Sequence, residues 1–147
     1  MKMQKNLFLI IFMALIMISC SKEKITIGTY IGHFQGSYTR DSLLYNSDRV
    51  YNLNIINSSN DEIVIKYNYS NSTLSRDKNR VSGILDISEV GGSDIGYYWG
   101  PAAISGNVMD EGDRNIISGD FSQTYKIISS VDSVQFETVI KGTFTIK

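Results

Sequence analysis

The sequence predicts a single all-β domain over residues 25–147, an antiparallel meander more typical of a barrel than of a sandwich. Apolar and polar side chains alternate from Val134 to Lys147, which is the period of a half-buried strand. Segments rich in Gly, Asn, Asp and Ser recur between the other apolar stretches, as turns do in an all-β chain. No segment after Lys24 repeats apolar residues at helical spacing, and Pro101 is the one proline. A second domain is therefore not expected.

Residues 1–19 have the pattern of a cleaved signal peptide. Lys2 and Lys5 precede an apolar run over residues 7–18, and a small residue, Ser19, follows it before Cys20. As a helix this run would span roughly 18 Å. That length falls short of the ~30 Å hydrocarbon core of a bilayer. We therefore expect removal of this segment and not a permanent transmembrane helix.

The segment Met17-Ile18-Ser19-Cys20 resembles the lipobox of bacterial lipoproteins. The resemblance implies that the thiol of Cys20 carries diacylglycerol and that its new amino group is acylated. Residues 20–24 would then form a short tether, and several acyl chains would hold the protein on a membrane. The expected location is the bacterial cell envelope at the outer membrane, with the periplasmic or surface face left open. The alternative is an ordinary secretory signal that happens to contain Cys20.

We expect strands wherever β-branched and aromatic residues gather between turn-rich segments. The predicted strands cover residues 25–38, 50–57, 62–69, 80–88, 103–109, 116–128 and 134–147. The predicted turn segments are 57–61, 70–79, 91–94 and 110–115. The first of these turns is short enough to close a hairpin.

The first predicted strand carries glycine and aromatic residues in turn on one face. This face consists of Gly28, Tyr30, Gly32, Phe34, Gly36 and Tyr38. Glycine weakens a strand, so its repetition indicates close packing of a neighbouring ring or sharp coiling. The opposite face begins apolar and ends polar, and we therefore expect the buried face to switch partway along the strand through a bend or bulge.

A lipobox, a short tether and a meander opening with Gly28-Thr29-Tyr30-Ile31-Gly32 resemble the small lipocalin-like lipoproteins of the Bacteroidota. The resemblance includes the closing stretch 141–147, Lys-Gly-Thr-Phe-Thr-Ile-Lys. It implies a meander barrel, a place in the cell envelope and an apolar cavity. Gly28-Thr29-Tyr30 stands where lipocalins carry Gly-x-Trp.

Three adjacent aromatics in Tyr97-Tyr98-Trp99-Gly100-Pro101 cannot all face one side of a strand, so at least one ring is expected outward or in a cleft. We expect a small apolar or sugar-like ligand in a cavity lined by Tyr30, Phe34, Trp99, Phe136 and Phe144. The alternative is a filled barrel, plugged by Trp99, that serves as a structural or interaction module of an envelope complex.

Other functions have less support in the sequence. Removal of Lys2 and Lys5 lowers the 14 basic residues to 12 against 15 acidic ones, a net charge of −3 that gives no basic stripe for nucleic acid. His33 is the one histidine, and no Gly-x-Ser-x-Gly nucleophile motif accompanies it, so a small hydrolase is the weakest candidate. No metal or cofactor is expected. Asp41-Ser42-Leu43 and Asp132-Ser133-Val134 resemble O-glycosylation acceptors of these bacteria, although solvated turn serines explain both.

Overall fold

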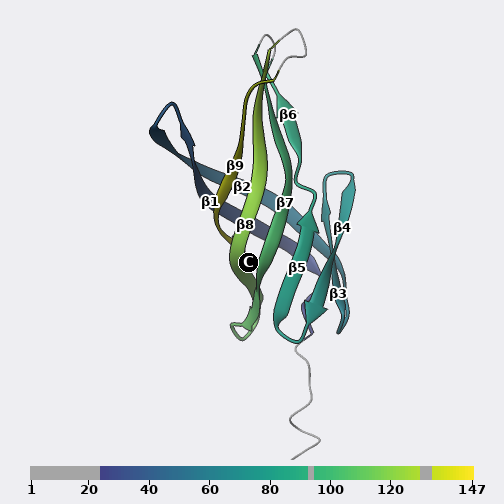
Figure 1. Ribbon diagram of the computed structural model, residues 1–147. Helices are drawn as coiled ribbons and strands as arrows, with labels where there is room; N and C mark the ends of the chain where they lie inside the picture. Colours follow the sequence, from purple (N-terminus) through teal and green to yellow (C-terminus); the bar gives the residue numbers. More distant parts are fainter. Residues whose placement is uncertain (1–23, 93–94, 130–133) are drawn as a thin grey trace, which may run out of the picture.

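The computed structural model describes residues 24–92, 95–129 and 134–147, and their regular structure is entirely β-strand (Figure 1). Cys20 and Ser133 lie outside the described residues. The strands are β1 (Gly28–Arg40), β2 (Leu43–Ser58), β3 (Glu62–Tyr67), β4 (Ser70–Asp77), β5 (Arg80–Leu85), β6 (Glu89–Gly91), β7 (Ile95–Asp110), β8 (Asn115–Ser129) and β9 (Val134–Ile146).

The strands form one antiparallel sheet that closes on itself. Their order is β5-β4-β3-β2-β1-β9-β8-β7-β6, and an additional β5–β7 pairing completes the ring. β6 pairs with β7 beyond the end of β5, so it continues along the same edge of β7 as a separate short strand. The predicted all-β antiparallel meander with a barrel-like form is thereby confirmed.

Two strands escaped the sequence prediction, and two are longer than predicted. Residues 70–77, assigned to a turn segment, form β4, and residues 89–91 form β6. β2 begins at Leu43 and not near Val50, and β7 begins at Ile95 and not near Ala103. The predicted hairpin loop between β2 and β3 is confirmed, because β2 ends at Ser58 and β3 begins at Glu62.

β4 is hard to recognise because its inward face is mostly polar. Ser72, Leu74 and Arg76 are all buried, and only Leu74 is apolar. The Nε of Arg76 donates to the carbonyl of Lys78 at 2.9 Å, and one terminal nitrogen donates to the carbonyl of Ser59 at 3.4 Å. These carbonyls compensate for the burial of the guanidinium group. Buried and exposed side chains therefore alternate along β4 as in any half-buried strand, but the buried ones are mostly polar.

Within β1 the face that carries glycine and aromatic residues points inward throughout, so the expected switch of the buried face partway along this strand is wrong; Ile25, which precedes β1, is buried although it was assigned to the opposite face. β1 pairs with β2 in one register from Gly28 to Arg40, without a bulge. Ile27 and Ile31, on the other face, are 57 % and 44 % exposed. A Cβ on Gly36 would lie 2.7 Å from Cγ2 of Ile140, so glycine here makes room for a core side chain.

Aromatic rings fill the ring of strands at the level of Phe34. The Phe34 ring stacks on Phe144 with centroids 5.5 Å apart and meets Tyr51 and Phe121 edge-on at 5.4 and 5.1 Å. All four side chains are at most 5 % exposed. Below them, the hydroxyl of Tyr30 donates to the carbonyl of Thr26 at 2.7 Å. This half of the barrel is thus packed with side chains like any protein core.

The opposite half is open because two pairings stop early. β1 and β9 pair only from Gly32–Ile146 to Ser37–Lys141. β2 first pairs with β3 at Asn54, so the backbone of the stretch 43–53 pairs only with β1 among the described strands. Figure 1 shows the β1–β2 hairpin leaning away from the long strands β7, β8 and β9. The inner faces of these two groups of strands are the walls of the open end.

Candidate functional site

Five half-buried or exposed aromatic side chains line the inner wall of the open end, and we call them the aromatic trough. They are Tyr38 on β1, Tyr45 on β2, Trp99 on β7, Tyr125 on β8 and Phe136 on β9. Strand alternation places these side chains on the inner face. Tyr38, Tyr45, Tyr125 and Phe136 each lie an even number of residues from an inward core residue of the same strand, and Trp99 pairs directly with Tyr125.

The rings of the trough form a connected series across the opening. Tyr38 stacks on Tyr45 at 5.3 Å and contacts Tyr125 at 5.5 Å and Phe136 at 6.0 Å. Tyr125 contacts Trp99 at 4.6 Å. Side chains therefore bridge β1 and β9 above the point where their backbones separate, and they leave an elongated aromatic surface.

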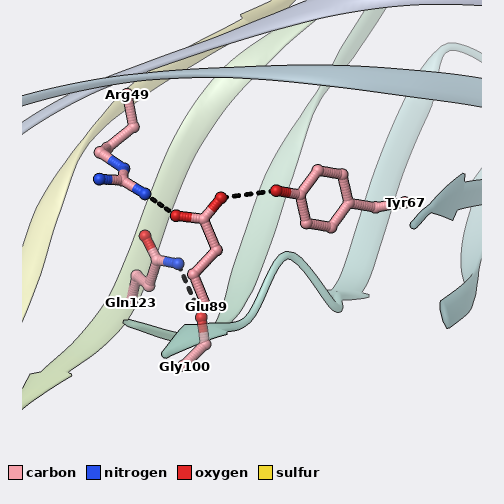
Figure 2. A network of polar contacts seen from close by, with 5 residues as sticks. All are labelled: Arg49, Tyr67, Glu89, Gly100 and Gln123. Atoms are coloured by element: carbon pink, nitrogen blue, oxygen red, sulfur yellow. Dashed lines mark hydrogen bonds and ion pairs between the residues drawn. The ribbon is translucent and has the colours of Figure 1, made fainter. Parts of the chain in front are cut away.

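An ion pair spans the other gap, between β2 and β6. Arg49 of β2 pairs with Glu89 of β6, and the hydroxyl of Tyr67 at the end of β3 donates to the second carboxylate oxygen of Glu89 at 2.6 Å (Figure 2). The guanidinium carbon of Arg49 lies 4.7 Å from the centroid of the Trp99 ring and 5.8 Å from that of Tyr51. Arg49 thus connects the aromatic trough to the packed core through cation–π contacts on both sides.

The connection between β5 and β6 fixes the position of Glu89. The backbone N–H of Asp86 donates to the hydroxyl of Ser72 at 2.7 Å, and the hydroxyl of Ser88 donates to the carboxylate of Asp86 at 2.6 Å. Hydrogen bonds from the hydroxyls of Ser88 and Ser70 lower the pKa of Asp86. Ile87 between them is fully buried, so this connection is tied down by packing as well as by hydrogen bonds.

The aromatic trough carries little net charge. Arg49 and Glu89 compensate each other, and Arg40 at the rim lies 3.5 Å from the carboxylate of Asp41 and over the ring of Phe136 at 5.1 Å. Burial, followed by the neighbouring Tyr125 and Tyr45, raises the pKa of Tyr38. The Tyr38 hydroxyl therefore keeps its proton at neutral pH and stays a hydrogen-bond donor.

Gln123 is a buried polar residue beside this network. Its side chain is 1 % exposed, and its Nε2 donates to the carbonyl of Gly100 at 2.6 Å. That carbonyl points inward at a bulge, where the β7–β8 register shifts between Trp99 and Ala102. Neither the amide oxygen of Gln123 nor the hydroxyl of Tyr51 has a hydrogen-bond partner among the described residues. An unpaired buried polar group costs about 1–3 kcal/mol, which makes these two atoms candidates for ligand contact.

The structure divides the five predicted ligand-binding residues into two groups. Tyr30, Phe34 and Phe144 are at most 6 % exposed and belong to the closed core, so they do not share one cavity with the other two. Trp99 and Phe136 lie in the aromatic trough. Sequence reasoning missed Tyr38, Tyr45, Arg49, Glu89, Gln123 and Tyr125 as parts of this site. Alternation along β8 is the one signal that could have placed Gln123 and Tyr125 on the same face.

The other candidate residues lie away from the trough. Ser42 is at the tip of the β1–β2 hairpin, where Asp41 and Ser42 have φ of 49° and 66°, as both central residues of a type I′ turn do. His33 is half-buried on the outer face, opposite Val50 and Thr145, with no acid or serine side chain bonded to it in the described chain. No group of three or more metal-ligating side chains occurs among the residues that the structure describes.

Comparisons with known proteins identify no relative. No family model matches the chain, and neither the curated proteins nor the solved structures contain a significant match. Over residues 24–92, 95–129 and 134–147, no helix has the length and apolar character required to cross a bilayer.

Proposed function

We propose that this protein is a lipid-anchored, non-catalytic binding protein of the bacterial envelope that holds a small ligand on its aromatic trough. One observation carries the binding proposal. The open end of the barrel presents five connected rings that remain partly exposed, above a core that side chains already fill. A monomeric domain normally buries such rings, and ligand sites combine aromatic walls with a few placed polar groups. The small-ligand hypothesis is kept, with its site moved from the interior to the open end.

The single tryptophan of the chain allows a direct test of the binding site. Trp99 lies in the trough, so its fluorescence reports on a ligand there without labelling. The full chain in detergent is titrated with laurate as an apolar probe and with neutral hexasaccharides, against empty micelles. We expect a saturable change with at least one probe. Tyr125→Ala should remove it, and Val139→Ala, an exposed residue of β9, should leave it unchanged. Constant emission with both kinds of probe would refute the proposal.

The anchor is tested separately, because it rests on residues outside the described part of the chain. Wild type and Cys20→Ala are expressed with an alkyne analogue of palmitate. The wild type should incorporate the label and fractionate with membranes, whereas Cys20→Ala should do neither. Equal labelling of the two proteins would contradict lipidation at Cys20.

A second function, an interaction module on an envelope complex, is favoured by the exposed apolar side chains. Leu43 and Leu44 beside the hairpin tip are 61 % and 70 % exposed, and Val90 and Ile95 near the end of β6 and β7 are 78 % and 65 % exposed. Such side chains could contact another protein. In that case Leu44→Asp would release a partner in envelope cross-linking while Trp99 emission stays unresponsive to small molecules.

A further inference from the structure

We propose that the ligand of the aromatic trough is a neutral oligosaccharide, one of whose hydroxyl groups donates to the buried amide oxygen of Gln123. This assignment rests on the proposed function and names the class of ligand that the site selects. It also gives Gln123 and Tyr51 a role that the packing of the core does not explain.

The first reason is the orientation of the Gln123 amide. The nitrogen is used by the carbonyl of Gly100, which leaves the oxygen on the other side of the group. Figure 2 shows this oxygen on the side facing Arg49, away from Gly100. Gln123 lies in β8 between the core residue Phe121 and the trough residue Tyr125, both on the same face of the strand. The unpaired acceptor thus lies on the inward face of β8, at the level between the packed core and the trough.

The hydroxyl of Tyr51 is the second polar group without a described partner. The Tyr51 ring meets that of Tyr67 edge-on at 5.4 Å and lies under the Arg49 guanidinium, so it belongs to the same cluster. Both atoms are already closed off from water, and a hydrocarbon chain in the trough would leave them without a partner. A sugar hydroxyl both donates and accepts, so it matches an amide acceptor and a phenol together.

The rings and charges of the trough also fit a neutral sugar better than an acid. Tyrosine and tryptophan combine apolar rings with polar edges, and successive ring centroids from Tyr45 through Tyr38 and Tyr125 to Trp99 follow at 5.3, 5.5 and 4.6 Å. This elongated surface suits a chain of sugar rings more than one ring. Arg49 is already paired with Glu89, so its guanidinium group attracts the carboxylate of an acidic ligand less strongly.

The test compares how neutral and apolar probes change the fluorescence emission of Trp99. The neutral probes are cellohexaose, maltohexaose and mannohexaose, and laurate is the apolar probe. We expect at least one hexasaccharide to change the emission saturably and laurate to bind more weakly. A response to laurate alone would overturn the sugar assignment and leave the proposed function standing. No response to any probe would overturn both.

Two variants separate ligand contact from folding. Tyr51→Phe removes a hydroxyl that has no partner in the described chain, so its thermal midpoint should equal or exceed that of the wild type. Its affinity for the hexasaccharide should fall about fivefold, the value of one hydrogen bond. Gln123→Met keeps the length of the side chain and should lower the affinity about tenfold or more. Tyr69→Phe, at a fully exposed tyrosine, is the matched control and should bind like the wild type. Wild-type affinity in both Tyr51→Phe and Gln123→Met would overturn the assignment.

Discussion

Truncation of Phe34 to alanine tests whether the lower half of the barrel is closed. Phe34 is 0 % exposed, and its ring touches Phe144, Tyr51 and Phe121, which come from three other strands. Phe→Ala in a core costs ~3–5 kcal/mol, depending on how far the walls collapse. Each aromatic pair adds about 0.5–1.5 kcal/mol, although such terms are not additive. Because hydrogen-bonded strands hold the three partner rings, we expect little collapse and a loss of about 4–5 kcal/mol.

Urea unfolding followed by far-ultraviolet circular dichroism measures this loss. A domain of this size has a free energy of unfolding of ~5–15 kcal/mol, so Phe34→Ala leaves a marginal fold. Phe34→Leu, with an expected loss of about 1–2 kcal/mol, keeps the comparison measurable if the alanine variant does not fold. Trp99→Ala is the control in the trough and should cost less than Phe34→Ala, because Trp99 is already partly exposed. A loss below ~1.5 kcal/mol for Phe34→Ala, with an unchanged m value, would show that the ring borders an empty cavity.

Three further outcomes follow from other contacts. Gly142→Ala should prevent folding or destabilise the protein strongly, because its Cβ would lie 2.0 Å from the carbonyl oxygen of Gln35. Gly28→Ala should be tolerated, because a Cβ there would have no atom within 4 Å. Equal thermal midpoints for the two variants would contradict this. Because the pKa of Asp86 is lowered in the folded state, its carboxylate stabilises the fold above the unfolded-state pKa, and this stabilisation is lost as the pH falls through the folded-state pKa. The difference in free energy of unfolding between wild type and Asp86→Asn should therefore vanish in urea titrations at acid pH. A difference that stays constant with pH would contradict this role of Asp86. Glu89→Gln should cost about 1–2 kcal/mol in urea, between exposed and buried pairs, and no loss would show that the ion pair is merely incidental.

The sequence predicted those strands whose inner and outer faces differ in polarity. β9 is the clearest case, since Ile140, Phe144 and Ile146 are buried and the residues between them are more exposed. The prediction missed β4 because its inward residues Ser72 and Arg76 are polar, and the hydrogen bonds that allow their burial exist only in the folded protein. The prediction missed the first half of β2 for another reason. Most of its side chains from Leu43 to Asp48 are exposed on both faces, so no alternation marks them.

The trough could not be derived from sequence because it depends on where pairing stops. Trp99 and Phe136 were candidates for their chemistry, yet nothing local separates them from Phe34 and Phe144. All four point inward by strand alternation. The register decides the difference, because the β1–β9 ladder ends at Ser37–Lys141 and everything beyond it faces an opening. Pairing limits of this kind depend on contacts between distant strands, which periodicity does not report.

Glycine explains where the opening begins. Gly36 and Gly142 pair directly across β1 and β9, one position before the ladder ends, and the Cα of Gly36 would lie 2.4 Å from a Cβ on Gly142. Any side chain on Gly142 would push the strands apart at the level where the closed core meets the trough. Glycine thus allows a close approach of β1 and β9 directly beside the place where the hairpin diverges. Rings on one side of this level contribute mainly to stability, and rings on the other remain available to a ligand. Core variants such as Phe34→Ala should therefore change mainly unfolding, and trough variants such as Tyr125→Ala mainly binding, even though core and trough share β1, β2, β8 and β9.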